Sequence, residues 1–126
     1  HRFVPIRLFL NNIMARGLMD AKASAEASVR ALAPRLPYTV VRPGGMGGPV
    51  PPPPAGEAPA LYRLEVGQGD HLRGRLSRDD AAACVAAVVR APEAVRNVTF
   101  EVVRRTPAEL ASDQHHTELF EGLEPD

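Results

Sequence analysis

The residues best suited to hold a ligand are Pro43, Gly44 and Gly45, which end a β-friendly run that begins at Tyr38. Its residues 39–41 are Thr, Val and Val, all β-branched, which is typical of a short buried strand in a parallel sheet covered on both faces. In an open α/β sheet, ligands bind at the loops that leave the carboxyl ends of the strands. The two glycines either let backbone come close to a ligand or supply a positive φ in the turn.

A second pair of chemically capable residues, Lys22 and Glu26, lies in an alanine-rich segment that predicts a helix from about Met19 to Leu32. Residues four apart face each other on a helix, so the pair on its own predicts a surface ion pair worth roughly a few tenths of a kcal/mol. Small side chains recur at the same spacing and give a face that can lie close against a sheet: Ala23, Ala27 and Ala31.

Other reactive side chains predict no further site. Cys84 is the single cysteine, which excludes an internal disulfide, does not indicate a zinc site and is consistent with a reducing compartment. His115 and His116 are adjacent, so they point to different sides of a helix or strand and lack a third ligand nearby. We therefore predict no metal site.

Composition narrows the classes of partner. Fifteen basic and fifteen acidic residues leave no net charge, so nucleic acid is not expected as a partner. No apolar run approaches the length of about 18 residues that a transmembrane helix needs. With 126 residues the chain forms one domain at most, and it is short for a complete dinucleotide-binding enzyme.

Three elements are expected after the Tyr38 strand. A proline-rich loop spans residues 46–60, and two short strands at 61–66 and 71–76 form a small β excursion beside the main sheet. A helix then begins at the N-cap Ser77, with Asp80 placed for a capping box, and its apolar character predicts heavy burial.

The end of the chain is expected to complete the same body. Residues 97–103 predict a last strand. Residues 106–126 form a polar tail in which Leu119, Phe120 and Leu123 are expected to dock on the domain. We therefore divide the chain into a domain at residues 1–105 and a docking tail at 106–126.

Three blocks in order resemble one protein family. A helix with Lys22-x-x-x-Glu26, the strand Tyr-Thr-Val-Val-Arg-Pro-Gly-Gly at 38–45, and the helix start Ser-Arg-Asp-Asp-Ala at 77–81 resemble the C-terminal half of an atypical short-chain dehydrogenase/reductase of the NmrA-like NAD(P)-binding group. The resemblance covers about Met19 to Val103. It implies an α/β fold, the C-terminal half of a Rossmann-like doubly wound parallel sheet.

The resemblance also assigns roles to residues. In such enzymes a Tyr-x-x-x-Lys pair transfers a proton and holds the nicotinamide ribose; Lys22 matches the lysine, but Leu18 stands where the tyrosine would be. Pro43, Gly44 and Gly45 would line the nicotinamide end of NADP or NAD. Arg42 would meet a phosphate or pair with an acid such as Asp79, and Arg78 and Asp79 would be structural.

The resemblance leaves three functions open. The chain contains no Gly-x-x-Gly-x-x-Gly turn for the pyrophosphate, so the cofactor is expected only if a first half of the fold is present. The first function is that of an NAD(P)-binding domain fragment whose catalysis is degenerate. The alternative is a non-catalytic structural or assembly subunit of a larger complex, for example a photosynthetic or respiratory one, which suits Leu18, the apolar segment 3–10 and the proline-rich loop. The third is a regulatory redox sensor that binds NADP without turning it over and that needs the same first half of the fold. The compartment is not fixed by the sequence: cytoplasm, chloroplast stroma and mitochondrial matrix all fit.

Overall fold

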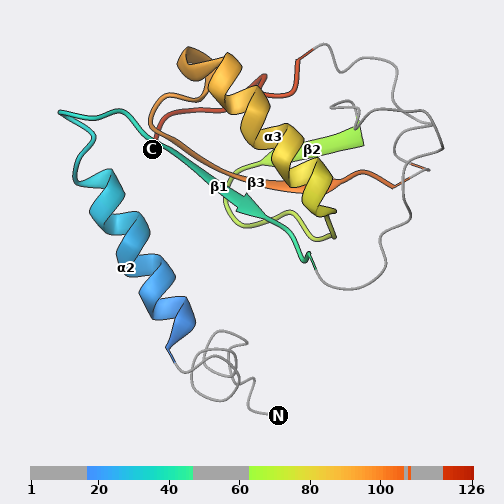
Figure 1. The fold of residues 1–126 in the computed structure, drawn as a ribbon, viewed down its shortest axis with the longest axis horizontal. Coiled ribbons are helices and arrows are strands. Elements are labelled where there is room, and N and C mark those ends of the chain that lie inside the picture. The colour runs from blue at the N-terminus through green and yellow to red at the C-terminus, as the bar shows by residue number, and fades with distance from the viewer. Residues whose placement is uncertain (1–16, 47–62, 107, 109–117) are drawn as a thin grey trace. The chain divides into compact units, whose positions relative to one another are not determined.

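The computed structural model describes residues 17–46, 63–106, 108 and 118–126 (Figure 1). The chain divides into two compact units, residues 1–38 and 39–126, and each unit is described here by itself. Apart from Met46, the predicted proline-rich loop lies outside the described residues, as do the apolar segment 3–10 and both adjacent histidines.

The described part of the first unit, residues 17–38, holds the helix α2 (Leu18–Arg30) and the turns that follow it, and α2 confirms the helix predicted from the alanine-rich composition. The helix is preceded by Gly17, whose φ of 86° is a left-handed conformation that glycine adopts readily. The Ala21 N–H donates to the Gly17 carbonyl at 3.0 Å. Glu26 forms its ion pair with Arg30, one turn further on, at 3.2 Å. The expected packing of the alanine face on the sheet stays a prediction, because helix and sheet belong to different units.

The second unit is an α/β body built on a three-stranded mixed sheet with the order β1-β3-β2. Its strands are β1 (Thr39–Pro43), β2 (Leu64–Gly67) and β3 (Val98–Arg104). β1 runs parallel to β3, with Val41 opposite Phe100. β2 runs antiparallel to β3, with Val66 opposite Val102.

The buried strand of this sheet is β3. Its residues from Val98 to Val103 are all buried, and Phe100 and Val102 are wholly inaccessible. The run at 39–43, predicted to be buried, is only half-buried, with Pro43 exposed. The prediction was wrong in this respect because β1 lies at the edge of the described sheet and pairs there on one side only, whereas β3 is covered by a strand on each side.

The two strands predicted at residues 61–66 and 71–76 do not form a separate pair in the structure. β2 belongs to the same sheet as β1 rather than to a hairpin beside it. The second strand predicted at 71–76 is reduced to one isolated parallel bridge between Arg75 and Gly45. The physical reason is that backbone N–H groups of residues 70–72 donate to the Glu101 carboxylate, and are thereby withdrawn from pairing with β2.

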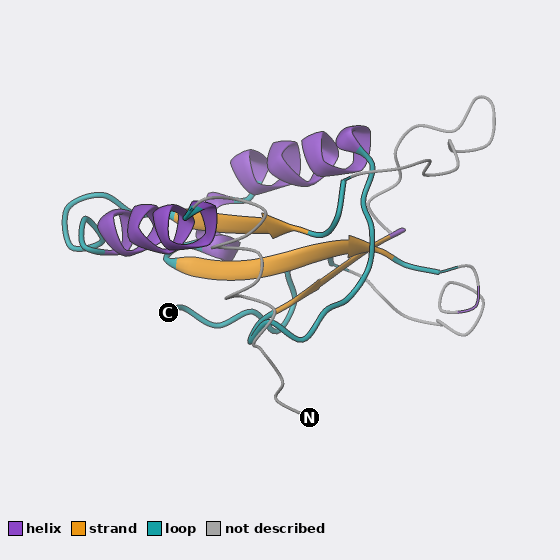
Figure 2. Cartoon of the chain, turned by 90° about the horizontal axis from the view of Figure 1, so that it is seen from below, coloured by secondary structure: helices purple, strands orange, loops and turns teal. Residues whose placement is uncertain are grey.

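One face of the sheet carries the helix α3 (Arg78–Arg90), as Figure 2 shows. The predicted N-cap Ser77 and its capping box with Asp80 are confirmed. Heavy burial of the helix is not: its buried residues are Asp80, Cys84 and Ala87, while Val85 and Val89 are 49% and 73% exposed. A single helix on one face of a sheet buries only the stripe that faces the strands, however apolar its other side is.

The core of this unit lies between α3 and β3 and is closed by two further segments. The short 3₁₀ helix η3 (Pro92–Val95) contributes the buried Val95. Leu119, Phe120 and Leu123 pack against the core, as the sequence predicts for these three residues. Within the described ranges, no helix has the length and apolar character that crossing a membrane requires.

Candidate functional site

The predicted cofactor turn lies at the carboxyl end of β1 and is bonded closely to the rest of the unit. The Gly44 N–H donates to the Val102 carbonyl at 2.9 Å, which continues the β1–β3 ladder past Pro43. The Gly45 N–H donates to the Gly74 carbonyl at 3.2 Å, and the Leu76 N–H donates to the Gly45 carbonyl at 3.1 Å. The turn is therefore held in place by backbone hydrogen bonds to Val102, Gly74 and Leu76.

The structure requires glycine at position 44 but not at position 45. A β-carbon at Gly44 would lie 2.7 Å from the Gly74 carbonyl oxygen and 3.0 Å from a Val103 methyl carbon. Gly44 is thus required by close approach to its own chain. Neither Gly44 nor Gly45 has a positive φ, so that part of the sequence interpretation was wrong.

Gly45 is the accessible position of this turn. Its residue is exposed, and the nearest atom to a β-carbon there would be 3.8 Å away on the Arg75 side chain, an ordinary contact distance. Pro43, just before it, is exposed as well. Of the two glycines, Gly45 is the one at which a β-carbon would clash with nothing in the described structure.

Lys22 lies in the first unit, one helical turn after Leu18, so both are on one face of α2 as the Tyr-x-x-x-Lys spacing requires. Lys22 is exposed, and Leu18 is 47% exposed. Leu18 has no proton to transfer. Since Lys22 and the glycine turn belong to different units, their sharing of one site stays a prediction.

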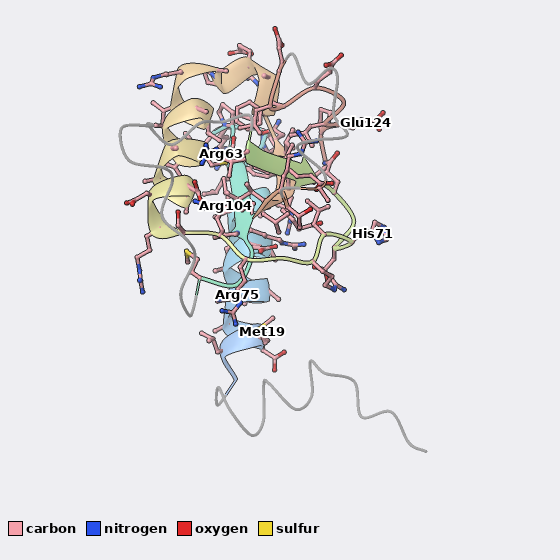
Figure 3. The ribbon with its side chains drawn as sticks, turned by 90° about the vertical axis from the view of Figure 1, so that its right-hand side faces the viewer. Met19, Arg63, His71, Arg75, Arg104 and Glu124 are labelled. Carbon is pink, nitrogen blue, oxygen red and sulfur yellow. The ribbon has the colours of Figure 1, made fainter. Side chains whose placement is uncertain are left out.

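A buried ion pair that the sequence did not predict joins α3 to the end of β3. Asp80 is 3% exposed, and one of its carboxylate oxygens accepts from Arg104 Nε at 2.8 Å and from a terminal guanidinium nitrogen at 2.5 Å. The same oxygen accepts from the Ser77 hydroxyl at 2.6 Å. Figure 3 labels Arg104 near the first turn of α3.

The acid that the structure buries beside an arginine is Asp80 and not its neighbour Asp79. Asp79, offered as the partner of Arg42, is exposed, and the acid that is buried beside a strand-end arginine is Asp80. Exposure of Arg78 and Asp79 leaves the helix start dependent on Ser77 and Asp80. The signal in the sequence was the N3 position of Asp80 in a capping box, which already turns its carboxylate inward.

On the other face of the sheet, the buried Glu101 organises the loop after β2. Its carboxylate accepts from the backbone N–H groups of Asp70, His71 and Leu72 at 2.8, 3.2 and 3.4 Å. Asp70 has a φ of 61°, and Gly69 has a φ of 88°, which together curl the loop around the carboxylate. The hydrogen-bonding capacity of this buried carboxylate is therefore met by its own chain.

Among the described residues, the third buried titratable group is the Cys84 thiol. Burial raises its pKa to about 11, so the thiol is neutral at physiological pH. A neutral, inaccessible thiol is neither a nucleophile nor a metal ligand. In the part of the chain that the structure describes, no three His, Cys, Asp or Glu residues are grouped so as to hold a metal ion.

The comparisons with known proteins add no relative. No family model, no curated protein and no solved structure matches this chain.

Proposed function

We propose that this chain is part of an NAD(P)-binding domain of the short-chain dehydrogenase/reductase type that holds a nucleotide without transferring hydride. The observation that carries the proposal is the exposed Gly45 at the carboxyl end of β1, a strand that runs parallel to β3. Ligands of open α/β sheets bind at this kind of position. The Gly45 N–H and carbonyl are already bonded to Gly74 and to Leu76, so a nucleotide would meet a turn that is set in advance.

Two groups of observations support the absence of catalysis. Leu18 supplies no phenol one turn before Lys22. In the second unit, the buried carboxylates of Asp80 and Glu101 each hold structural donors, and the Cys84 thiol is protonated. Acid–base catalysis needs a group within hydrogen-bond reach of the substrate, and these three groups are buried.

The test is calorimetric titration of the complete natural polypeptide with NADP and with NAD, together with a hydride-transfer assay. We expect binding of one of them and no turnover. Gly45→Val adds bulk at an exposed position where a β-carbon makes only ordinary contacts, so it should keep the melting temperature while weakening binding at least tenfold. Ala94→Val, on the exposed surface of η3, is the matched control and should change neither.

Failure of both nucleotides to bind would reject the nucleotide role, and robust hydride transfer would reject the non-catalytic role.

Val85 and Val89, exposed on α3, favour a second candidate, a structural subunit of a larger assembly. If the chain has this role, it should co-purify with that assembly and carry no nucleotide. The double variant Val85→Ser/Val89→Ser should lose the association. Exposed apolar side chains on one helix face are typical of protein contacts.

A further inference from the structure

Residues 118–126 contact the rest of the second unit through both apolar and polar groups. Their apolar half packs on the core: the Phe120 ring lies 5.6 Å from the Phe100 ring, centroid to centroid, at an interplanar angle of 56°. Leu119 and Leu123 pack against the same core. Tilted aromatic pairs at this separation are attractive beyond the area they bury.

The polar half of the segment is held by a buried threonine. Thr99 is 7% exposed, and its backbone N–H and hydroxyl both donate to the Asp126 carboxylate, at 3.3 and 2.5 Å. The Asp126 N–H donates to the Asn97 carbonyl at 2.8 Å. Asn97 has a φ of 58°, a left-handed conformation that asparagine tolerates better than most residues.

Gln68 binds the backbone of the segment between these two ends. Its amide nitrogen donates to the Glu124 carbonyl at 2.8 Å, and the Glu124 N–H donates back to its amide oxygen at 2.9 Å. The same nitrogen also donates to the Thr99 carbonyl at 3.1 Å, which fixes the side chain. A side-chain amide that bonds both backbone groups of one residue recognises an extended peptide whatever its side chain.

The segment therefore meets a surface that has the parts of a peptide-binding site. These are an aromatic contact, a contact for a leucine, a side-chain amide that binds backbone, and two hydrogen-bond donors for a carboxylate. In Figure 3, Glu124 lies on the side of the sheet away from α3, as does His71. Phe120, Leu123 and Asp126 follow each other at intervals of three residues.

We propose that Phe100, Gln68, Asn97 and Thr99 form a binding site for a short peptide of the pattern Phe-x-x-Leu-x-x-Asp, and that the chain's own residues 118–126 occupy it as a tethered ligand. Tethering gives the segment an effective concentration in the millimolar range. A free peptide of the same pattern therefore enters only when the tethered copy is weakened. This inference does not depend on the proposed nucleotide role.

The experiment uses the full chain and a fluorescent peptide of residues 118–126, with binding followed by anisotropy. Asp126→Asn in the chain weakens the tethered ligand and leaves the site intact. We expect this variant to bind the peptide at least tenfold more tightly than the unmodified chain does. Charge-assisted hydrogen bonds are strong enough for a change of that size.

Two variants in the Asp126→Asn background test the site itself. Thr99→Val and Gln68→Met should each weaken peptide binding about tenfold, while Thr106→Val, at an exposed residue, should leave it unchanged. A peptide with Asp replaced by Asn at its position 126 should also bind more weakly. Equal binding by the unmodified and Asp126→Asn chains, or binding insensitive to both site variants, would overturn the proposal. If Thr99→Val does not fold, Gln68→Met alone decides, because Gln68 is only half-buried.

Discussion

Gly44 lies so close to Gly74 that a β-carbon on Gly44 would come within 2.7 Å of the Gly74 carbonyl oxygen. The contact joins the end of β1 to the segment that leads into α3. A methyl group cannot share this space with a backbone oxygen, so the chain must shift on one side or the other. Packing therefore explains the glycine at position 44, whereas position 45 is exposed and is not restricted in this way.

Gly44→Ala is expected to destabilise the unit by about 1 to 3 kcal/mol, the usual cost of forcing extra atoms into a packed site. Gly45→Ala is the matched control, because its β-carbon would meet only ordinary contacts. It should stay within about 0.5 kcal/mol of the unmodified chain, as most surface substitutions do. Urea unfolding of both variants measures the difference. Equal stabilities would mean that the Gly74 contact is not a constraint.

Arg104→Leu should be strongly destabilising, because it leaves the Asp80 carboxylate buried without its cation. Breaking a buried pair by removing one partner costs about 3 to 5 kcal/mol, and somewhat less is expected here since the Arg104 side chain keeps 18% of its exposure. Arg78→Leu removes an exposed arginine from the first turn of the same helix and should be nearly neutral. Chemical denaturation of the two variants compares them, and a loss below about 1 kcal/mol for Arg104→Leu would contradict the assigned role.

Glu101→Gln should loosen the loop after β2 rather than the whole sheet. The variant places an amide NH₂ where backbone N–H groups now donate, so at least one of the three bonds from residues 70–72 is lost. Hydrogen exchange should become at least tenfold faster at the amides of Asp70, His71 or Leu72. Glu65→Gln, on half-buried β2, is the control and should leave these amides protected. Unchanged exchange in Glu101→Gln would show that the carboxylate does not hold the loop.

Much of the local structure could be predicted because local rules decide it. Ser77 and Asp80 satisfy each other within one turn, so their spacing alone predicted the capping box. Leu119, Phe120 and Leu123 were predicted to dock because they are the apolar residues of an otherwise polar tail. The α/β class was expected from the resemblance to the dehydrogenase family, and the sheet with its helix α3 has it.

What could not be predicted depends on residues far apart in the chain. Composition does not reveal which β-branched run is central, and β3 rather than β1 proved to be the buried strand. Glu101 lies about thirty residues from the N–H groups it binds, so the lost strand at 71–76 had no local signal. Gly74 likewise explains Gly44 only once the two segments are seen side by side.

The Cys84 thiol gives a prediction with a defined pH window. Burial raises its pKa from 9.0 to about 11, so between these two values the unfolded chain has lost this proton while the folded chain keeps it. Stability contributed by the neutral thiol is therefore fully present below pH 9 and falls as pH rises toward 11, by at most about 2 to 3 kcal/mol. Cys84→Ala lacks this dependence, so the difference in unfolding free energy between the two chains should shrink over the same window. Urea unfolding at pH 8 and pH 10.5 measures that difference, and a thiol reagent at pH 8 should label the native chain only at the rate at which it unfolds. Rapid labelling of the folded chain would show that Cys84 is accessible, and a difference that stays constant with pH would show that folding does not raise the pKa of its thiol.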